Sequence, residues 1–451
     1  MEDVVPITPH IRCSNANETI ELGRGPVNIS QGKFKVDAKG VARLLLAPKC
    51  RVVVSVNLPA IKENRRDWLQ DEFTYLRFGK FGRPTKTICI RNSFSSAGKN
   101  ELDFLPTGGP FSIFRDQRIR LKNTIFHLIN FQNFLCATKH SSDFSFAVGT
   151  GQRRLGRVIL KDSNWAIEIQ ALPQTNEIVD QLTLHGGHAI THVGRLERVD
   201  GGSFSINAAN NALTHLQHFL SFARGQWCAP FGIVGTSTRG EILYEDWSQR
   251  LVSPWATPPS WFDDLNGQWL ADCYPGFIRL LKDPSLGKSV ADALYWYLRS
   301  NRGGEGAGVD GGLLLAQAAL ERLANAYLQK TSLSASGYAA QRIRQMCEKL
   351  AIPIQLSKST KNLRRARGQK TWIDGPGAIS KIRNELIHAK SQLQVPLHSV
   401  IWEASQLAHW YIELIILRLS GYNGHYSNRI VARHIGDKET VPWKKNTRRK
   451  A

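Results

Sequence analysis

Short apolar runs separated by turn residues dominate the first 205 residues of the chain. The runs 44–46 and 52–54 are examples, and the stretch 158–172 predicts a hairpin with a turn at 162–164. In its second arm, which starts at Trp165, apolar and polar residues alternate, as in a half-buried strand. Many short strands are typical of a sandwich or barrel, so residues 1–205 are predicted to form a β-rich sensor or regulatory domain.

The hydrophobic period changes near residue 206. Apolar residues in 208–224 have helical spacing, and Gly225 is a suitable helix stop. Strand-like sequence returns over 231–247, and helical spacing resumes over 261–281 and 290–299. We therefore expect a mixed connector over 206–309.

A glycine-rich break at 302–312 contains Gly306, Gly308 and Gly311 in the spacing GxGxxG. A dinucleotide-binding turn requires a strand before these glycines. The preceding segment, 291–298, has a helical pattern instead. The match is therefore interpreted as accidental, and the segment as a flexible boundary.

Four amphipathic segments follow the break, and they predict a bundle over 310–430. The expected helices span 313–330, 336–350, 379–390 and 396–419. A basic tail over 431–451 completes the chain. The predicted fold class is α+β, a β-rich N-terminal domain followed by a C-terminal all-α four-helix bundle.

The charge balance favours a polyanionic partner. The 451 residues include 59 Lys and Arg against 37 Asp and Glu, a formal net charge of +22, and such an excess is typical of nucleic-acid-binding proteins. Neither a basic amphipathic helix nor a lipidation motif points to a membrane surface. The apolar stretch 412–419 is too short to cross a bilayer, and the acidic N-terminus has no apolar signal segment.

Seven scattered cysteines form no CxxC pair. Neither a disulfide framework nor a cysteine zinc site is supported, and we expect buried thiols in a reducing cytoplasm. His185, His188 and His192 have a spacing compatible with a metal site. No cysteine or carboxylate cluster accompanies them, so structural turn and strand histidines are the better interpretation.

The third C-terminal helix carries a polar set, Arg383, Asn384 and His388. Asn384 and His388 share a helical face, whereas the backbone of Arg383 points roughly 140° away from that of His388. Histidine can exchange a proton with a ribose hydroxyl near neutral pH, and arginine can hold a phosphate. These residue types therefore suit phosphodiester cleavage without a metal.

Spacing alone favours a solvated helix face instead. The chain has other Arg and His pairs at similar separations, namely Arg120 with His127, Arg418 with His425, and Arg429 with His434. None of these has a polar residue directly after its arginine.

The segment 382–389 nevertheless resembles the RxxxxH signature of the HEPN superfamily, in which a polar residue, commonly Asn, follows the arginine. The resemblance covers about 310–425 and includes the place of the motif on the third of four helices. Upstream, 191–194, 200–204 and 219–222 resemble the N-terminal region of ApeA-type antiphage proteins, and 320–323 is similar to a glutamate-bearing segment of that group.

The resemblance implies a metal-independent endoribonuclease without a cofactor, with its site at a homodimer interface. Arg383 and His388 would be catalytic and Asn384 would support them. Glu321 would brace the site, although a solvated helix residue is an equal alternative. The implied role is cleavage of host or phage RNA in abortive infection, with a phage-derived trigger at the N-terminal domain and a cytoplasmic location.

Two further expectations accompany this interpretation. Trp402, Trp410 and Tyr411 of the last helix would form part of the dimer contact or the internal core. The rival function is a non-catalytic HEPN module that dimerises, holds nucleotide or RNA, and regulates a partner.

A basic connection leads into the motif helix and is expected to be a loop. Its cations are Lys358, Lys361, Arg364, Arg365, Arg367 and Lys370. Phosphate contacts that position RNA are the functional interpretation, and a solvated loop is the alternative. Trp372 at its end is expected to anchor the connection to the bundle.

Overall fold

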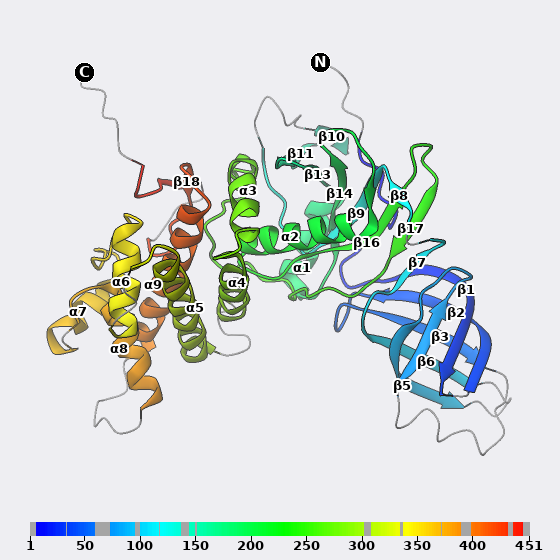
Figure 1. The fold of residues 1–451 in the computed structure, drawn as a ribbon, viewed down its shortest axis with the longest axis horizontal. Coiled ribbons are helices and arrows are strands. Elements are labelled where there is room, and N and C mark those ends of the chain that lie inside the picture. The colour runs from blue at the N-terminus through cyan, green and yellow to red at the C-terminus, as the bar shows by residue number, and fades with distance from the viewer. Residues whose placement is uncertain are drawn as a thin grey trace.

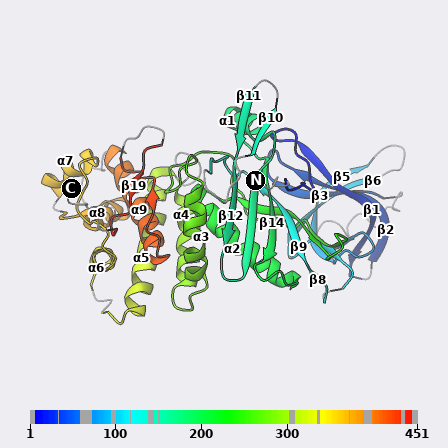
Figure 2. The same cartoon turned by 90° about the horizontal axis from the view of Figure 1, so that it is seen from above.

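The computed structural model describes residues 6–32, 34–58, 73–94, 100–116, 118–136, 144–148, 151–301, 308–333, 337–370, 372–388, 398–431 and 436–444. The molecule is elongated, with a β-barrel at one end, helices at the other and a second sheet between them (Figures 1 and 2). The predicted order, a β-rich N-terminal region followed by a helical C-terminal region, is confirmed at this level.

The N-terminal strands close into a barrel, as the many short strands allowed. The order around it is β1-β2-β3-β6-β5-β4, and β4 returns to β1 through the pairs Val27–Phe78 to Ser30–Tyr75. Alternate side chains such as Val54 and Val56 fill the interior. The bounds are β1 (Thr19–Gln31), β2 (Phe34–Leu45), β3 (Arg51–Leu58), β4 (Thr74–Phe78), β5 (Thr85–Phe94) and β6 (Asn100–Gly108).

A second, seven-stranded sheet has the order β12-β13-β14-β9-β16-β17-β7. The hairpin expected over 158–172 is present as β12 and β13. The sheet extends past residue 205, because β16 and β17, which follow α2, pair back onto it. Its strands are β7 (Ser112–Phe114), β9 (Asn123–Ile129), β12 (Arg157–Lys161), β13 (Trp165–Ala171), β14 (Ile190–Arg198), β16 (Ala229–Thr236) and β17 (Ile242–Asp246).

Three two-stranded sheets complete the described β structure. They pair β8 (Arg120–Leu121) with β15 (Phe204–Ser205), β10 (Phe144–Val148) with β11 (Gly151–Leu155), and β18 (His425–Tyr426) with β19 (Glu439–Thr440).

Both faces of the seven-stranded sheet are buried, and they belong to different hydrophobic cores. Val193 packs in the core that fills the barrel, whereas Leu196, on the opposite face of β14, packs in the core that continues into the helices. Helix α1 (Thr175–His185) contacts β14, and α2 (Ile206–Arg224) contacts β16. The sheet therefore contributes one face to each of the two hydrophobic cores.

The predicted helices of the C-terminal half are present with shifted bounds. The connector contributes α3 (Gln268–Leu281) and α4 (Gly287–Ser300), and α4 packs directly on α5. The four expected bundle segments correspond to α5 (Gly308–Lys330), α6 (Ala339–Lys349), α8 (Gly375–Ile387) and α9 (His398–Leu419). Helix α5 contacts α6, α8 and α9, and α8 contacts α6 and α9.

One prediction is wrong: the basic connection is not a loop, because most of it forms a helix, α7 (Lys361–Lys370). The N-terminus of α7 is stabilised by a residue that comes about forty positions later in the sequence. The carboxylate of Glu403 on α9 accepts hydrogen bonds from the backbone N–H groups of Asn362, at 3.1 Å, and Leu363, at 2.9 Å. These two amides would otherwise lack partners at a helix start.

The cysteines are free thiols, and five of the seven are buried. Burial raises the pKa of Cys13 to about 12, so its thiol stays protonated. Within the described ranges, no helix combines the length and apolar character needed to cross a membrane.

Candidate functional site

Helix α8, which carries the motif, is fixed at its N-terminus. Asp374 is the N-cap, and its side chain accepts from the backbone N–H of Gly377 at 2.8 Å. The same carboxylate forms an ion pair with Arg344 of α6. Ile379 and Ile382 are fully buried and pack the inner face of α8 against the core. The start and the rotation of the motif helix are therefore both set by its neighbours.

The outer face of α8 brings Arg383 and Asn384 together. Nη1 of Arg383 donates to Oδ1 of Asn384 at 3.0 Å. Arg383 is half-buried and Asn384 is exposed. Asn384 lies one turn before His388, so the long arginine side chain reaches toward the histidine's side of the helix despite its backbone offset.

His388 lies at the end of the helix and not inside it. Its N–H donates to the carbonyl of Asn384 at 2.9 Å, but its φ of −98° and ψ of 100° are extended. The helix thus ends at Ile387, earlier than the predicted residue 390. The imidazole is exposed and projects from a point where the chain has left the helix.

Glu321 lies beside the motif helix. The side-chain amide of Gln317 donates to Glu321 Oε1 at 3.0 Å and contacts Ser380 Oγ at 3.5 Å. Ser380 precedes Arg383 by one turn of α8. Glu321 is half-buried and tied to α8 through one intermediate, so it is not a freely solvated side chain.

The cations of the basic connection are on the surface. Lys358, Lys361, Arg364, Arg365 and Arg367 are exposed, and the side chain of Lys370 lies outside the described residues. Helix α7 packs on α9 through the buried Leu363. Trp372 is buried, as expected of an anchor. The motif and the basic helix are therefore on separate elements that both pack against α9.

The three spaced histidines are not gathered around a ligand position. His185 is exposed at the end of α1. Nδ1 of His188 bonds the carbonyl of Leu46 at 2.9 Å, and His192 is buried and stacked on Phe134. No group of three metal-ligating side chains occurs among the described residues. His188 and His192 are core side chains, in line with the structural interpretation.

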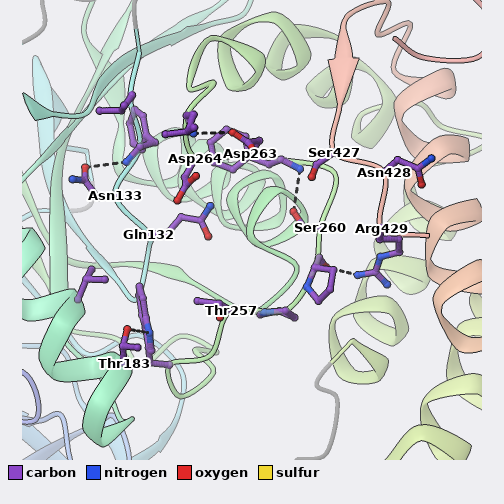
Figure 3. A pocket seen from close by; sticks show the side chains of 18 of the residues that line it. Gln132, Asn133, Thr183, Thr257, Ser260, Asp263, Asp264, Ser427, Asn428 and Arg429 are labelled. Atoms are coloured by element: carbon purple, nitrogen blue, oxygen red, sulfur yellow. Dashed lines mark hydrogen bonds between the residues drawn. The ribbon is translucent and has the colours of Figure 1, made fainter. Parts of the chain in front are cut away.

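Two cavities lie where the loop 255–265 meets the helical region, a boundary that we call the seam. The larger holds about 630 Å³ and is lined by the loop, by residues 132–135, by α1 and by 427–431 (Figure 3). The smaller holds about 260 Å³ and lies between the loop, α9 and the start of α5. Arg383, Asn384 and His388 line neither cavity.

A buried ion pair lies beside the seam, on its helical side. The side chains of Arg429 and Glu413 have no exposed surface, and Nε of Arg429 lies 3.3 Å from Oε1 of Glu413. Tyr297 of α4 donates to the same carboxylate at 2.6 Å, and burial beside it raises the pKa of Tyr297. The guanidinium also bonds the carbonyl of Pro259, as Figure 3 shows.

This ion pair was not predicted from the sequence, although a signal was present. Glu413 is a carboxylate inside the most apolar stretch of the chain, and a buried charge requires a partner. Arg429 had been considered only as part of a chance pair with His434, which lies outside the described residues.

The fold and the motif define a mixed α/β protein in which a barrel and a second sheet precede a helical region with a polar, basic surface. The chain is similar over residues 116–258 to the family described as YopA central domain, and over 283–440 to the YopA C-terminal domain. It is 28% identical over 442 residues to the "SPbeta prophage-derived uncharacterized protein YopA" of Bacillus subtilis (strain 168), covering 95% of this chain and 96% of that protein. No solved structure matches it.

Proposed function

We propose that the chain is a metal-independent endoribonuclease of the HEPN type, with α5, α6, α8 and α9 as its bundle. The observation that carries the proposal is the arrangement at the end of α8, where Arg383 is hydrogen-bonded to Asn384 one turn before an exposed His388. These are the groups needed to hold a phosphate and to move a proton. Glu321 supports α8 from α5 through Gln317.

The reaction is a transesterification followed by release of the leaving strand. His388 takes the proton of a ribose 2′-hydroxyl as its oxygen attacks the adjacent phosphorus. Arg383 stabilises the charge that builds on the phosphate oxygens. As the bond to the 5′-oxygen breaks, that oxygen takes a proton from water and His388 gives its own proton back to solvent, leaving a 2′,3′-cyclic phosphate and a 5′-hydroxyl end. Asn384 holds the arginine in place.

The biological role that we propose is antiphage defence by abortive infection, with RNA of the host or the phage as substrate, a homodimer as the active form and a phage-derived trigger acting through the barrel end. The similar protein of Bacillus subtilis is named as prophage-derived. This role rests on the resemblance of the motif region and of the N-terminal segments to ApeA-type proteins.

Cleavage of labelled RNA in the presence of EDTA tests the activity. Arg383→Ala and His388→Ala should each lower the rate by about 10²–10⁴-fold, the usual contribution of a general acid–base group. Arg239→Ala and His185→Ala are matched controls, since both residues are exposed and lie outside the helical region. Cleavage at the wild-type rate by folded His388→Ala would refute the assignment, as would a strict need for magnesium.

A non-catalytic module that binds RNA or nucleotide and regulates a partner is the alternative. It predicts RNA retention by the basic surface with no change in RNA length over hours. Mapping of the product ends separates the two functions, since only the enzyme generates 2′,3′-cyclic phosphates.

A further inference from the structure

The smaller seam cavity contains a buried polar group with unused hydrogen-bonding capacity. Gln226 lies in the connection between α2 and β16 and lines the cavity, with 1% of its surface exposed. Neither its side-chain oxygen nor its side-chain nitrogen has a hydrogen-bond partner. Burying an amide without partners is costly, so such a group requires a hydrogen-bonding partner that the described protein atoms do not supply.

The wall that carries Gln226 is held rigidly. The Asn301 amide donates to the carbonyls of Gly225 at 3.1 Å and Pro259 at 3.0 Å, and its oxygen accepts from Arg429 at 2.6 Å. Gly225 has a φ of +74°, and a Cβ there would lie 2.6 Å from the Asn301 amide nitrogen. The glycine is therefore required for the close approach, and Gln226 is presented from a fixed backbone.

The opposite wall is a single stripe of α9. Trp402, Ser405, Gln406 and His409 follow the spacing of one helical face and all line the cavity. Trp402 is 42% exposed, so its indole is available at the rim. An exposed aromatic ring beside a polar cavity is a stacking platform for a flat ligand.

His409 is neutral, and both of its ring nitrogens are hydrogen-bonded within the protein. Burial, with the positive charge of Arg429, lowers the pKa of His409 to about 3. Its Nδ1 is hydrogen-bonded with the carbonyl of Ser405 at 2.6 Å, and its Nε2 with the hydroxyl of Ser300 at 2.8 Å. Gln226, by contrast, is buried with both polar atoms of its amide available to a ligand.

The described lining contains no Lys, Arg, Asp or Glu. The volume is below the roughly 300 Å³ at which pockets for drug-sized ligands begin. The ligand is accordingly small and flat enough to stack on an indole.

We propose that the smaller seam cavity binds a planar heterocycle with a hydrogen-bond donor beside an acceptor, the edge chemistry of a nucleobase. A glutamine amide offers the complementary donor and acceptor in one plane and can pair with such an edge through two bonds. The site is separate from Arg383 and His388. Glu403, next to the cavity stripe on α9, holds the start of the basic helix, so the ligand and α7 share one supporting helix.

Titration calorimetry of the full chain with 9-methyladenine and 9-methylhypoxanthine, both of which have a donor beside an acceptor, tests the proposal. 9-Methylpurine has acceptors but no N–H donor and is the matched control ligand. At least one of the first two should bind, and 9-methylpurine should bind at least tenfold more weakly. Absence of binding by both ligands would overturn the proposal, as would equal binding of 9-methylpurine.

Two variants locate the bound ligand. Gln226→Met keeps the side-chain volume and should weaken binding roughly 10–100-fold, because two hydrogen bonds are lost. Trp402→Ala changes a rim residue and should weaken it about tenfold. Gln329→Met, an exposed position on α5, should leave the affinity unchanged. If neither cavity variant lowers the affinity, the ligand binds elsewhere and the proposal is wrong; RNA cleavage does not enter this test.

Discussion

Arg429 and Glu413 show how a single buried charge depends on its partner. Removing the arginine takes away the positive charge that faces this carboxylate in the helical core. Arg429→Met should therefore lower the free energy of unfolding by about 3–5 kcal/mol, whereas replacing both residues with apolar ones should recover most of that loss. Urea denaturation measures the difference, with the exposed Arg239→Met as control. A change below about 1 kcal/mol in the single variant would contradict the pairing.

His192 gives the protein a dependence of stability on acid. Burial in the first place, and Arg224 in the second, lower the pKa of His192 to about 3 in the folded chain, against an ordinary 6.5. Below pH 6.5 the unfolded chain binds a proton that the folded chain does not. Stability is therefore lost as the pH falls from about 6.5 toward 3, by at most about 1.4 kcal/mol per pH unit.

His192→Phe should make the fall of the unfolding free energy with falling pH less steep, by up to about 1.4 kcal/mol per pH unit, the contribution of one proton. Denaturation at pH 7.0, 6.0 and 5.0 measures this slope. Phe131, whose ring contacts His192 at 5.4 Å between centroids, provides the control. Phe131→Leu should lower stability by the same amount at each pH. An unchanged slope in the histidine variant would show that His192 takes up its proton in the folded state as well.

Single residues were predictable where one property decided their place. Trp372 was expected to be buried and is. Arg383 and Asn384 lie on the outer face of α8, whereas His388, expected inside the helix, lies just after its end. Gln226 and Asn301 were missed because nothing local distinguishes a buried glutamine or asparagine from one in solvent. The partners of Asn301 come from segments 42 to 128 residues away.

Among the elements, α7 turns the basic connection into a structured surface. Lys361, Arg364 and Arg365 follow helical spacing and are exposed together. Neutralising Arg364, Arg365 and Arg367 should reduce the salt dependence of RNA binding by about 0.7 in slope for each lost phosphate contact. Filter binding at several salt concentrations gives the slope.

The comparison variant neutralises Lys35, Lys39 and Lys49, three exposed cations of the barrel region. It removes the same formal charge and should leave the slope close to that of the wild type. Equal slopes for the two triple variants would mean that α7 makes no specific contact with RNA.

Elements were predictable from the chain when their apolar period was strong. Helix α2, the β12–β13 hairpin and the four bundle segments all have it, and all are present. Helix α7 was missed because only Leu363 and Ala366 pack inward, and because its start is stabilised by Glu403 about forty residues later. The pairing of β9 with β16 could not be predicted from local sequence either, since it joins segments about a hundred residues apart.

For the whole molecule, the position of the motif argues for an assembly of two chains. One α8 offers a single Arg383 and a single His388. Two copies related by a two-fold axis would place both motifs around one cleft. Of the aromatic residues considered for that contact, Trp410 and Tyr411 are buried in the core of their own chain, which leaves Trp402 exposed.

Light scattering at the protein concentration of the cleavage assay should therefore give the mass of a dimer. Mixing Arg383→Ala with His388→Ala chains should restore part of the activity if the site pairs one subunit's arginine with the partner's histidine. A monomer that cuts RNA at full rate would refute the shared site.

The hydrophobic core that begins at Leu121 in β8 continues through α2, α3 and α4 to Val441 near the C-terminus. One continuous cluster of described apolar side chains joins the seven-stranded sheet to the helices, so the two regions share a core. Heating should melt residues 118–444 in one calorimetric endotherm. Recombination between relatives would be expected to preserve this stretch as a single heritable unit, because a crossover at residue 310 would join two half-cores with unmatched surfaces.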